Sequence, residues 1–169
     1  MPRSSTEQRP PLAIRRATPA DLDVVVELRL ALLRTHRDNP VYGRLRPDAR
    51  RRARRLFAAQ LANEEEVTFL AERSGVVVGI LRSMIGRSSP LVEPAHFGYV
   101  ASVYVRPAAR RAGVLTALLA EAESWCRARG VSELRLHNAA DNPLANATWD
   151  ALGFAVVEYL RVRPLAHTH

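Results

Sequence analysis

Apolar residues along the chain switch between helical and extended spacing. Apolar positions three or four residues apart predict helices over about 18–36, 47–63, 111–129 and 142–152. Runs of β-branched or alternating apolar residues predict strands over 12–16, 67–73, 76–85, 97–105, 133–137 and 154–163. Thr18 followed by Pro19 marks a helix start, and Gly130 is placed to end the helix that begins near residue 111.

The same spacing predicts which side of each helix is buried. A helix that covers a sheet turns one apolar stripe inward and leaves its polar residues in solvent. The residues predicted to face the core are Leu22, Val25, Val26, Leu28, Leu32 and Leu33 in the first helix, Ala53, Leu56, Phe57 and Leu61 in the second, and Leu115, Leu118, Leu119, Ala122, Trp125 and Cys126 in the third.

The order of these elements predicts an α/β fold, α+β by some schemes, in a single domain. A small turn at Ser74-Gly75 joins two strands as an antiparallel hairpin, whereas the helix over 111–129 crosses between two strands and makes them parallel. We expect a mixed, mostly antiparallel sheet with helices on both faces and a ligand crevice where strands 97–105 and 133–137 splay apart. The domain spans 12–163, between a disordered N-terminal tail over 1–11 and a C-terminal tail over 164–169.

The segment from Val105 to Leu119 carries the strongest chemical signal. A strand ends at Val105, an Arg-rich loop with one glycine follows, and helical spacing begins near Ala112. A helix start presents free backbone N–H groups and the positive end of the helix dipole, and Arg110 and Arg111 add full charges beside them. This stretch predicts an anion site whose ligand carries phosphate.

Composition narrows the class of protein. The chain has 169 residues and a formal net charge of +8, and all its basic side chains are arginine. Nucleic acid is an unlikely main partner because the arginines are scattered and aromatic residues are few. The cluster over 50–55 is interpreted either as a solvated helix face or as a patch for an acidic ligand. The single cysteine, Cys126, is expected to be a buried structural thiol.

No apolar run approaches the length of a membrane span, and Met1 to Pro11 lacks the apolar middle of a signal peptide. A cytoplasmic protein with no membrane partner is therefore expected.

Several short motifs, in their order and spacing, resemble the GNAT superfamily of N-acetyltransferases. The acyl-CoA motif of that family is matched by Arg110, Gly113 and Leu115, after Val105-Arg106-Pro107 at the strand end. A second signature of the family is matched by Asn142-Pro143-Leu144-Ala145 and then Leu152-Gly153-Phe154. The resemblance covers about residues 12–163.

The resemblance implies acetyl-CoA, or a related acyl-CoA, as co-substrate. Its pyrophosphate would lie on the amides of roughly 111–116, and its pantetheine arm would pair with the strand that ends at Val105. Asn142 would either hold the CoA arm or serve as a plain cap of its helix. The cofactor-binding residues implied are Val103, Tyr104, Val105, Arg110, Arg111, Ala112, Gly113, Val114, Leu115, Thr116, Asn142 and Ala145. No metal ligand is implied.

The catalytic positions depart from the family pattern. Trp149 stands where the usual general acid is a tyrosine, Tyr99 stands where some relatives carry a glutamate base, and Leu115 replaces Gly or Ala. The groups left for proton chemistry are Glu93, His96, Tyr99, Tyr104 and His137. We expect His137, Tyr99 and Tyr104 to be the catalytic candidates, while a structural His137 and a water chain without a dedicated base stay open.

The function implied is transfer of an acetyl group from acetyl-CoA to a primary amine of a small molecule or a protein, by direct attack on the thioester. The alternative is a catalytically degenerate acyl-CoA-binding sensor or partner module. The acceptor would be shaped by the first two helices, the loop over 86–94 and the last strand. Residues 154–163 contain no turn residue, so one long edge strand there invites pairing into a homodimer.

Overall fold

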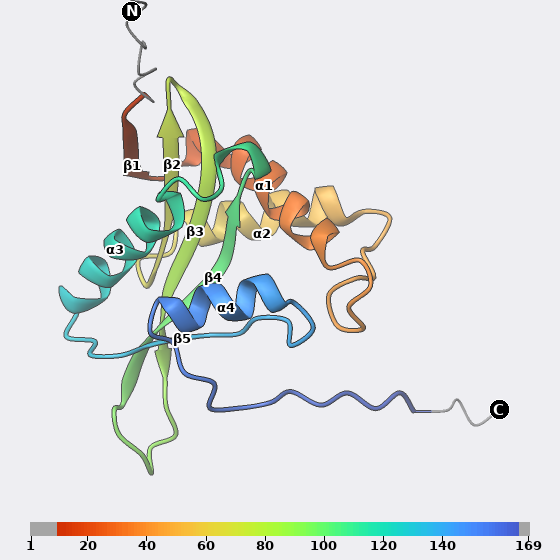
Figure 1. The fold of residues 1–169 in the computed structure, drawn as a ribbon, viewed down its shortest axis with the longest axis vertical. Helices are drawn as coiled ribbons and strands as arrows, with labels where there is room; N and C mark the ends of the chain where they lie inside the picture. Colours follow the sequence, from red (N-terminus) through yellow and green to blue (C-terminus); the bar gives the residue numbers. More distant parts are fainter. Residues whose placement is uncertain (1–9, 166–169) are drawn as a thin grey trace, which may run out of the picture.

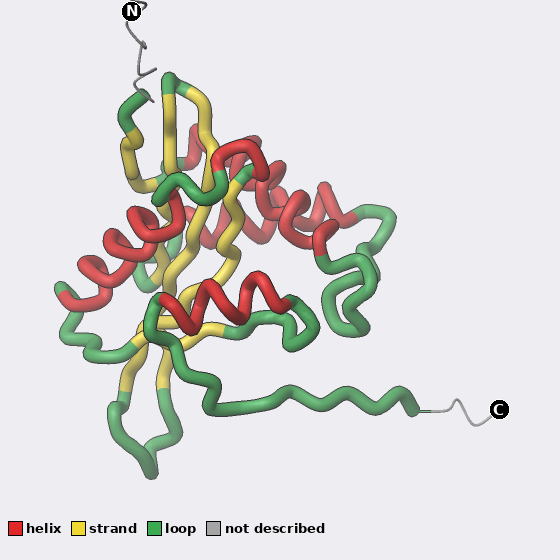
Figure 2. Tube along the Cα trace, in the orientation of Figure 1, coloured by secondary structure: helices red, strands yellow, loops and turns green. Residues whose placement is uncertain are grey.

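The computed structural model describes residues 10–165, in which helices and strands follow the predicted order up to residue 151 (Figures 1 and 2). The strands are β1 (Leu12–Arg16), β2 (Glu66–Arg73), β3 (Val76–Arg87), β4 (His96–Val105) and β5 (Leu134–Leu136). The helices are α1 (Leu22–Thr35), α2 (Ala49–Leu61), α3 (Val114–Arg127) and α4 (Pro143–Ala151), with short 3-10 turns η1 (Pro19–Asp21) and η2 (Pro107–Ala109). The predicted tails fall largely outside the described residues.

The five strands form one mixed sheet in the order β1-β2-β3-β4-β5. The first four pair antiparallel with their neighbours, and β5 pairs parallel with β4. This confirms the predicted single-domain α/β fold with a mostly antiparallel sheet. No helix within residues 10–165 is long and apolar enough to cross a membrane.

Helices cover both faces of the sheet, and two apolar clusters form between the layers. Because successive side chains of a strand point to opposite faces, Ile80 packs beneath α1 and α2 while Leu81 packs beneath α3, and both are fully buried. Figure 1 shows α3 on one side of the sheet and α1 with α2 on the other. Truncating either side chain to alanine is expected to cost about 2–5 kcal/mol of folding free energy.

Five residues predicted to face the core lie outside it. Leu32, Leu33 and Leu61 are only half-buried and belong to neither core cluster. The buried stripe of α2 is narrow and consists of Ala53 and Phe57, so Leu56 is displaced from it and is 52% exposed. In α3 the first buried residue is Val114, and Leu115 is only half-buried outside the core cluster. The remaining predicted α3 residues, Leu118, Leu119, Ala122, Trp125 and Cys126, are buried as expected.

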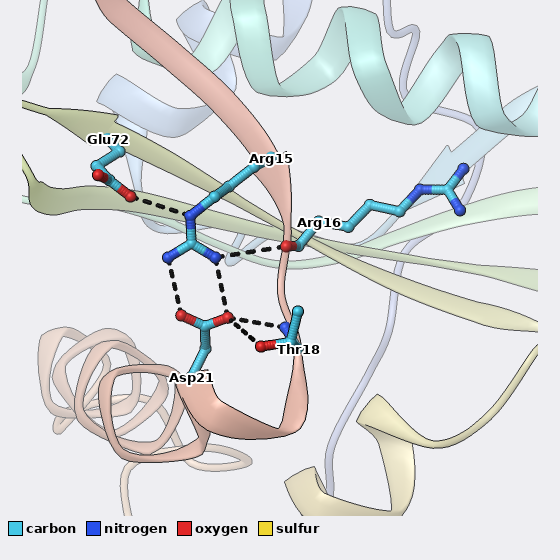
Figure 3. A network of polar contacts seen from close by, with 5 residues as sticks. All are labelled: Arg15, Arg16, Thr18, Asp21 and Glu72. Carbon is cyan, nitrogen blue, oxygen red and sulfur yellow. Dashed lines mark hydrogen bonds and ion pairs between the residues drawn. The ribbon is translucent and has the colours of Figure 1, made fainter.

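A polar network fastens the start of α1 to the sheet (Figure 3). The Arg15 guanidinium donates to both carboxylate oxygens of Asp21, at 2.8 and 2.9 Å, and to Glu72 at 3.0 Å. Asp21 also accepts from the Thr18 backbone N–H at 2.8 Å, so Thr18 and Pro19 open the helix as predicted. The Arg15 hydrogen bonds, with those of Thr18, hold the pKa of Asp21 well below its usual range.

The predicted last strand over 154–163 is wrong. Residues 154–165, here called the C-terminal arm, are assigned to no helix or strand and trail away from the body of the molecule (Figure 2). A strand needs a hydrogen-bonded neighbour, and the arm has none among the described residues. Phe154 packs against the core, but the large apolar side chains beyond it are left in solvent, with Val157 92% exposed and Leu160 71% exposed.

Candidate functional site

The crevice predicted between the fourth and fifth strands is present in the sheet. β5 pairs with only Gly98, Tyr99 and Val100 of β4, although β4 continues to Val105. The register of β3 against β4 shifts near Ser102, which has a left-handed φ of 61°. β4 therefore leaves β5 at this irregularity, and the edge of β4 over 101–105 is open to a ligand on the β5 side.

The loop after β4 forms the rim of this crevice. The N–H of Arg110 donates to the Pro107 carbonyl at 3.3 Å, and the next such bond beyond the loop runs from Ala117 to the Gly113 carbonyl at 3.0 Å. The backbone N–H groups of residues 111–116 lie between these two hydrogen bonds. Among the described residues they have no backbone acceptor in the loop, and the N–H groups in the first turn of a helix have no acceptor within the helix. Arg73 braces the loop by donating to the Ala112 carbonyl at 3.0 Å. The rim thus offers consecutive free donors at the positive end of α3.

Two residues with left-handed backbone conformations shape the rim. Gly113, directly before α3, has a φ of 75°, and Arg111 has a φ of 57°. A Cβ built on Gly113 would meet nothing within 4 Å, so the space beside this backbone is open. Glycine is therefore required by the backbone angle, and its missing side chain leaves room for a ligand to approach the amides.

The two arginines of the motif lie differently. Arg110 Nε donates to the Val105 carbonyl at 3.0 Å, and its guanidinium lies 5.9 Å from the centre of the Tyr104 ring. Arg111 is exposed at the rim. Arg110 thus fastens the loop to the end of β4, while Arg111 is the freer cation.

Tyr99 and His137, two of the catalytic candidates, meet beside the paired segments of β4 and β5. The Tyr99 hydroxyl and His137 Nδ1 are 2.6 Å apart, and their ring centroids are 5.6 Å apart. Burial, and then the neighbouring Tyr42, raise the pKa of Tyr99. His137 is exposed, directly after β5. The phenol oxygen can accept a hydrogen bond from Nδ1–H of the imidazole, which fixes the orientation of the ring and leaves Nε2 without a proton.

Both side chains line a cavity of about 1010 Å³. Its walls come from Asn39–Tyr42 between α1 and α2, from β5, from α4 and from the C-terminal arm. The third catalytic candidate, Tyr104, packs instead against the core under α1 and α2. Glu93 and His96 also lie outside the cavity wall. Of the candidates for proton chemistry, only Tyr99 and His137 are brought together.

The α4 residues of the second motif have mainly structural contacts. Asn142 Oδ1 accepts from the Ala145 N–H at 3.0 Å and caps the helix. Trp149 packs edge-on against Phe154, with ring centroids 5.3 Å apart. The side chain at the usual acid position therefore forms part of the cavity wall by packing.

Sequence reasoning missed the charge of the cavity. Five carboxylates and two arginines line it, and ion pairs join Arg127 to Glu123 and Arg135 to Glu133. No ion pair is found within residues 10–165 for the other three, Asp141, Asp150 and Glu158. A locally acidic cavity in a chain of net charge +8 favours a cationic ligand. Single carboxylates scattered over three segments give no sequence signal.

The residues present fit an acyl-CoA molecule. The free amides and Arg111 suit a pyrophosphate, and the open edge of β4 suits the amide groups of a pantetheine arm. The Ser102 hydroxyl, at the irregularity in β4, is buried and has no hydrogen-bond partner within residues 10–165. The crevice then leads from the rim toward the Tyr99–His137 pair, where a thioester would meet an acceptor.

Comparison with known proteins supports this interpretation. The model of the acetyltransferase (GNAT) family matches residues 29–154. The chain is 31% identical over 147 residues to the aminoglycoside N(6')-acetyltransferase type 1 of Stenotrophomonas maltophilia, covering 86% of this chain and 87% of that protein. A match to the protein of the same name from Acinetobacter haemolyticus is 36% identical over 66 residues, 39% of this chain, and spans only 46% of that protein.

The fold is shared with solved structures as well. A structure described as a predicted acetyltransferase with acetyl-CoA, from Clostridium acetobutylicum, superposes with a TM-score of 0.76. It is 21% identical, and the superposition covers 94% of this chain and 100% of that one. The two chains therefore share their fold.

Proposed function

Because this chain belongs to the acetyltransferase (GNAT) family, we propose that it transfers an acetyl group from acetyl-CoA to a primary amine held in the acidic cavity. The observation that carries the proposal is the geometry of the rim over 111–116, where consecutive free amides at a helix start border the open edge of β4. In this assignment acetyl-CoA supplies the activated acyl group. A cytoplasmic location and a homodimer belong to the same proposal.

The acceptor we propose is a small molecule with several amines, of the aminoglycoside class. Two curated relatives carry that substrate in their names, and one aligns over most of both chains. The cavity supports this class independently, because Asp141, Asp150 and Glu158 attract cations and have no ion-pair partner among the described residues. Its volume of about 1010 Å³ also suits a ligand larger than a simple alkylamine.

The transfer step assigns one role to each group of the pair. The free amine attacks the thioester carbonyl, a C–N bond forms, and the C–S bond breaks with its electron pair on sulfur. His137 Nδ1–H donates to the Tyr99 oxygen through the 2.6 Å hydrogen bond, so Nε2 is unprotonated and takes the proton that the amine nitrogen releases. The proton can then return to the thiolate through solvent. Trp149 has no proton to give in this scheme and serves as cavity wall.

The test of the function measures acetyl-CoA-dependent thiol release with a panel of amines. An aminoglycoside is expected to stimulate release and to gain an acetyl group, which mass spectrometry detects. Neutral hydroxylated sugars of the same size are expected to be inactive. Saturable acetyl-CoA binding without transfer to any amine would contradict the proposal and favour the sensor alternative.

The proposed roles of His137 and Tyr99 are tested by substitution, with a second histidine outside the cavity as control. His137→Gln removes the group that accepts the proton and is expected to lower kcat by about 100-fold or more. Tyr99→Phe removes only the orienting hydrogen bond, so a smaller loss in kcat with little change in the KM for acetyl-CoA is expected. His96→Gln is the control, because His96 is exposed and lies outside the cavity wall. Equal effects of the two histidine substitutions would refute the assignment.

A further inference from the structure

Two arginines lie in the layer between the sheet and helices α1 and α2. Arg82 of β3 is on the same face of the sheet as Ile80, which packs beneath these helices, because residues two apart in a strand share a face. Arg29 of α1 lies close enough to Arg82 for the charge of Arg82 to act on it. The layer therefore holds two guanidinium groups near each other.

These two positive charges are balanced by one ion pair within residues 10–165. Arg82 pairs with Glu66 of β2, and the two side chains are only 11% and 13% exposed. No carboxylate lies within ion-pair distance of Arg29 in this part of the chain. The cluster of Arg29, Arg82 and Glu66 thus carries an excess of one positive charge.

The two arginines also have hydrogen-bond donors to spare. Nε of Arg29 and Nε of Arg82 are both buried and have no acceptor among the described residues. The Arg29 guanidinium lies 4.9 Å from the centre of the Phe57 ring, but a ring face is only a weak acceptor of hydrogen bonds. Because a guanidinium has donors and no acceptor, the missing partner is a hydrogen-bond acceptor.

The positive charge of Arg29 is unfavourable where it lies. Burial, and then the neighbouring Arg82, lower the pKa of Arg29 to about 10. At neutral pH the guanidinium still keeps its proton, so the unpaired charge remains in the folded protein. A bound anion would cancel this charge and accept hydrogen bonds from the free donors.

We propose that Arg29 and Arg82 form a binding site for one small monovalent anion, such as chloride, between α1 and β3. A single negative charge cancels the excess of one positive charge. The ion must be small because α1 and α2 cover this face of the sheet and leave Arg82 only 11% exposed (Figure 1). Arg29 is partly exposed, so an ion can reach the pair from solvent.

This anion site is separate from the acetyl-transfer pocket. Neither arginine lines the cavity that contains Tyr99 and His137. The two sites are still neighbours, because burial raises the pKa of Tyr99 and the charge of Arg82 opposes that rise. The inference goes beyond the proposed function and does not depend on it.

Thermal unfolding of the full chain in chloride and in gluconate tests the proposal. At equal ionic strength the two sodium salts screen surface charges alike, but gluconate is too large to reach the pair. Replacing gluconate by about 0.2 M chloride is expected to raise the thermal midpoint by about 3 °C. Equal midpoints of the wild type in the two salts would overturn the proposal, whether or not the variants below fold.

Substitution of Arg29 tests whether the chloride effect comes from this pair. Arg29→Met keeps an unbranched side chain against Phe57 but removes the charge, so its midpoint is expected to be the same in both salts. In gluconate it should unfold at no lower temperature than the wild type, because an unpaired buried charge has been removed. Arg55→Met is the matched control, since Arg55 is exposed on α2 and its loss should leave the chloride effect unchanged. An equal chloride effect in Arg29→Met and the wild type would overturn the proposal.

A crystal soaked in bromide locates the ion directly. Bromide replaces chloride and gives an anomalous signal, which is expected between the guanidinium groups of Arg29 and Arg82. A water molecule at this place, or bromide bound only as an adventitious ion at surface arginines, would overturn the proposal.

Discussion

Substituting Gly113 by glutamate is the sharpest perturbation of the proposed pyrophosphate site. A Cβ at this position meets nothing within 4 Å, so the new side chain would project into open space beside the free amides. The glutamate carboxylate would accept hydrogen bonds from the free amides in place of the pyrophosphate, and its negative charge would repel the pyrophosphate. Charge-assisted hydrogen bonds contribute about 1.5–3 kcal/mol each, so losing two costs about 3–6 kcal/mol. Acetyl-CoA affinity should fall at least 100-fold.

The same helix offers a matched control for backbone strain. Gly130, just beyond the other end of α3, has a φ of 72° and an equally open Cβ position. A side chain in this left-handed region costs about 1–2 kcal/mol of stability at either glycine. Gly130→Glu should therefore lower the thermal midpoint much as Gly113→Glu does, yet keep normal acetyl-CoA affinity by isothermal titration calorimetry. Near-normal affinity in Gly113→Glu, or an equal loss in both variants, would refute the assignment.

Three further predictions follow from individual contacts. Trp149→Phe should retain most acetyl-transfer activity, since Trp149 packs on Phe154, and a loss of several orders of magnitude in kcat would show a direct role. Asp21→Asn should lower unfolding free energy by about 1–2 kcal/mol at pH 7. The pKa of Asp21 is depressed in the fold, so its contribution is full above pH about 4 and is lost as pH falls further, and the deficit of the variant in chemical denaturation should shrink there. Asp38→Asn, at a 91% exposed carboxylate, should change stability by less than about 0.5 kcal/mol at either pH. Duplex DNA should bind weakly and dissociate at physiological salt. The reason is that three arginines of the 50–55 cluster already form ion pairs, Arg51 and Arg52 with Asp48 and Arg54 with Asp23. DNA binding that persists at high salt would instead favour nucleic acid as a partner.

Local patterns were enough to predict most of the fold. The Thr18-Pro19 start of the first helix and the Ser74-Gly75 hairpin both depend on neighbouring residues, and both are present. The rim over 111–116 was predicted for the same reason, since strand end, glycine and helix start are contiguous in the chain. Leu56 and Leu115 were predicted to be buried but are not. The face of a helix that contacts the core is narrower than the set of apolar residues spaced three or four apart along it.

Features that depend on long-range pairing were not predictable in the same way. Tyr99 and His137 meet because Tyr99 pairs with Arg135 across the parallel strands, and sequence spacing does not specify that register. The strand expected over 154–163 has the right composition, but a strand also needs a neighbour, and the described part of the chain provides none. The absence of a strand at the arm could therefore not be predicted from the arm's own residues.

A structure of the protein with CoA bound tests the central claim most directly. We expect pyrophosphate oxygens within about 2.7–3.2 Å of backbone nitrogens over 111–116. The pantetheine amides should pair with the edge of β4 near Val103 and Val105, and the sulfur should point toward Tyr99 and His137. CoA bound elsewhere, or a pyrophosphate that contacts only arginine side chains and no amide of this loop, would contradict the account.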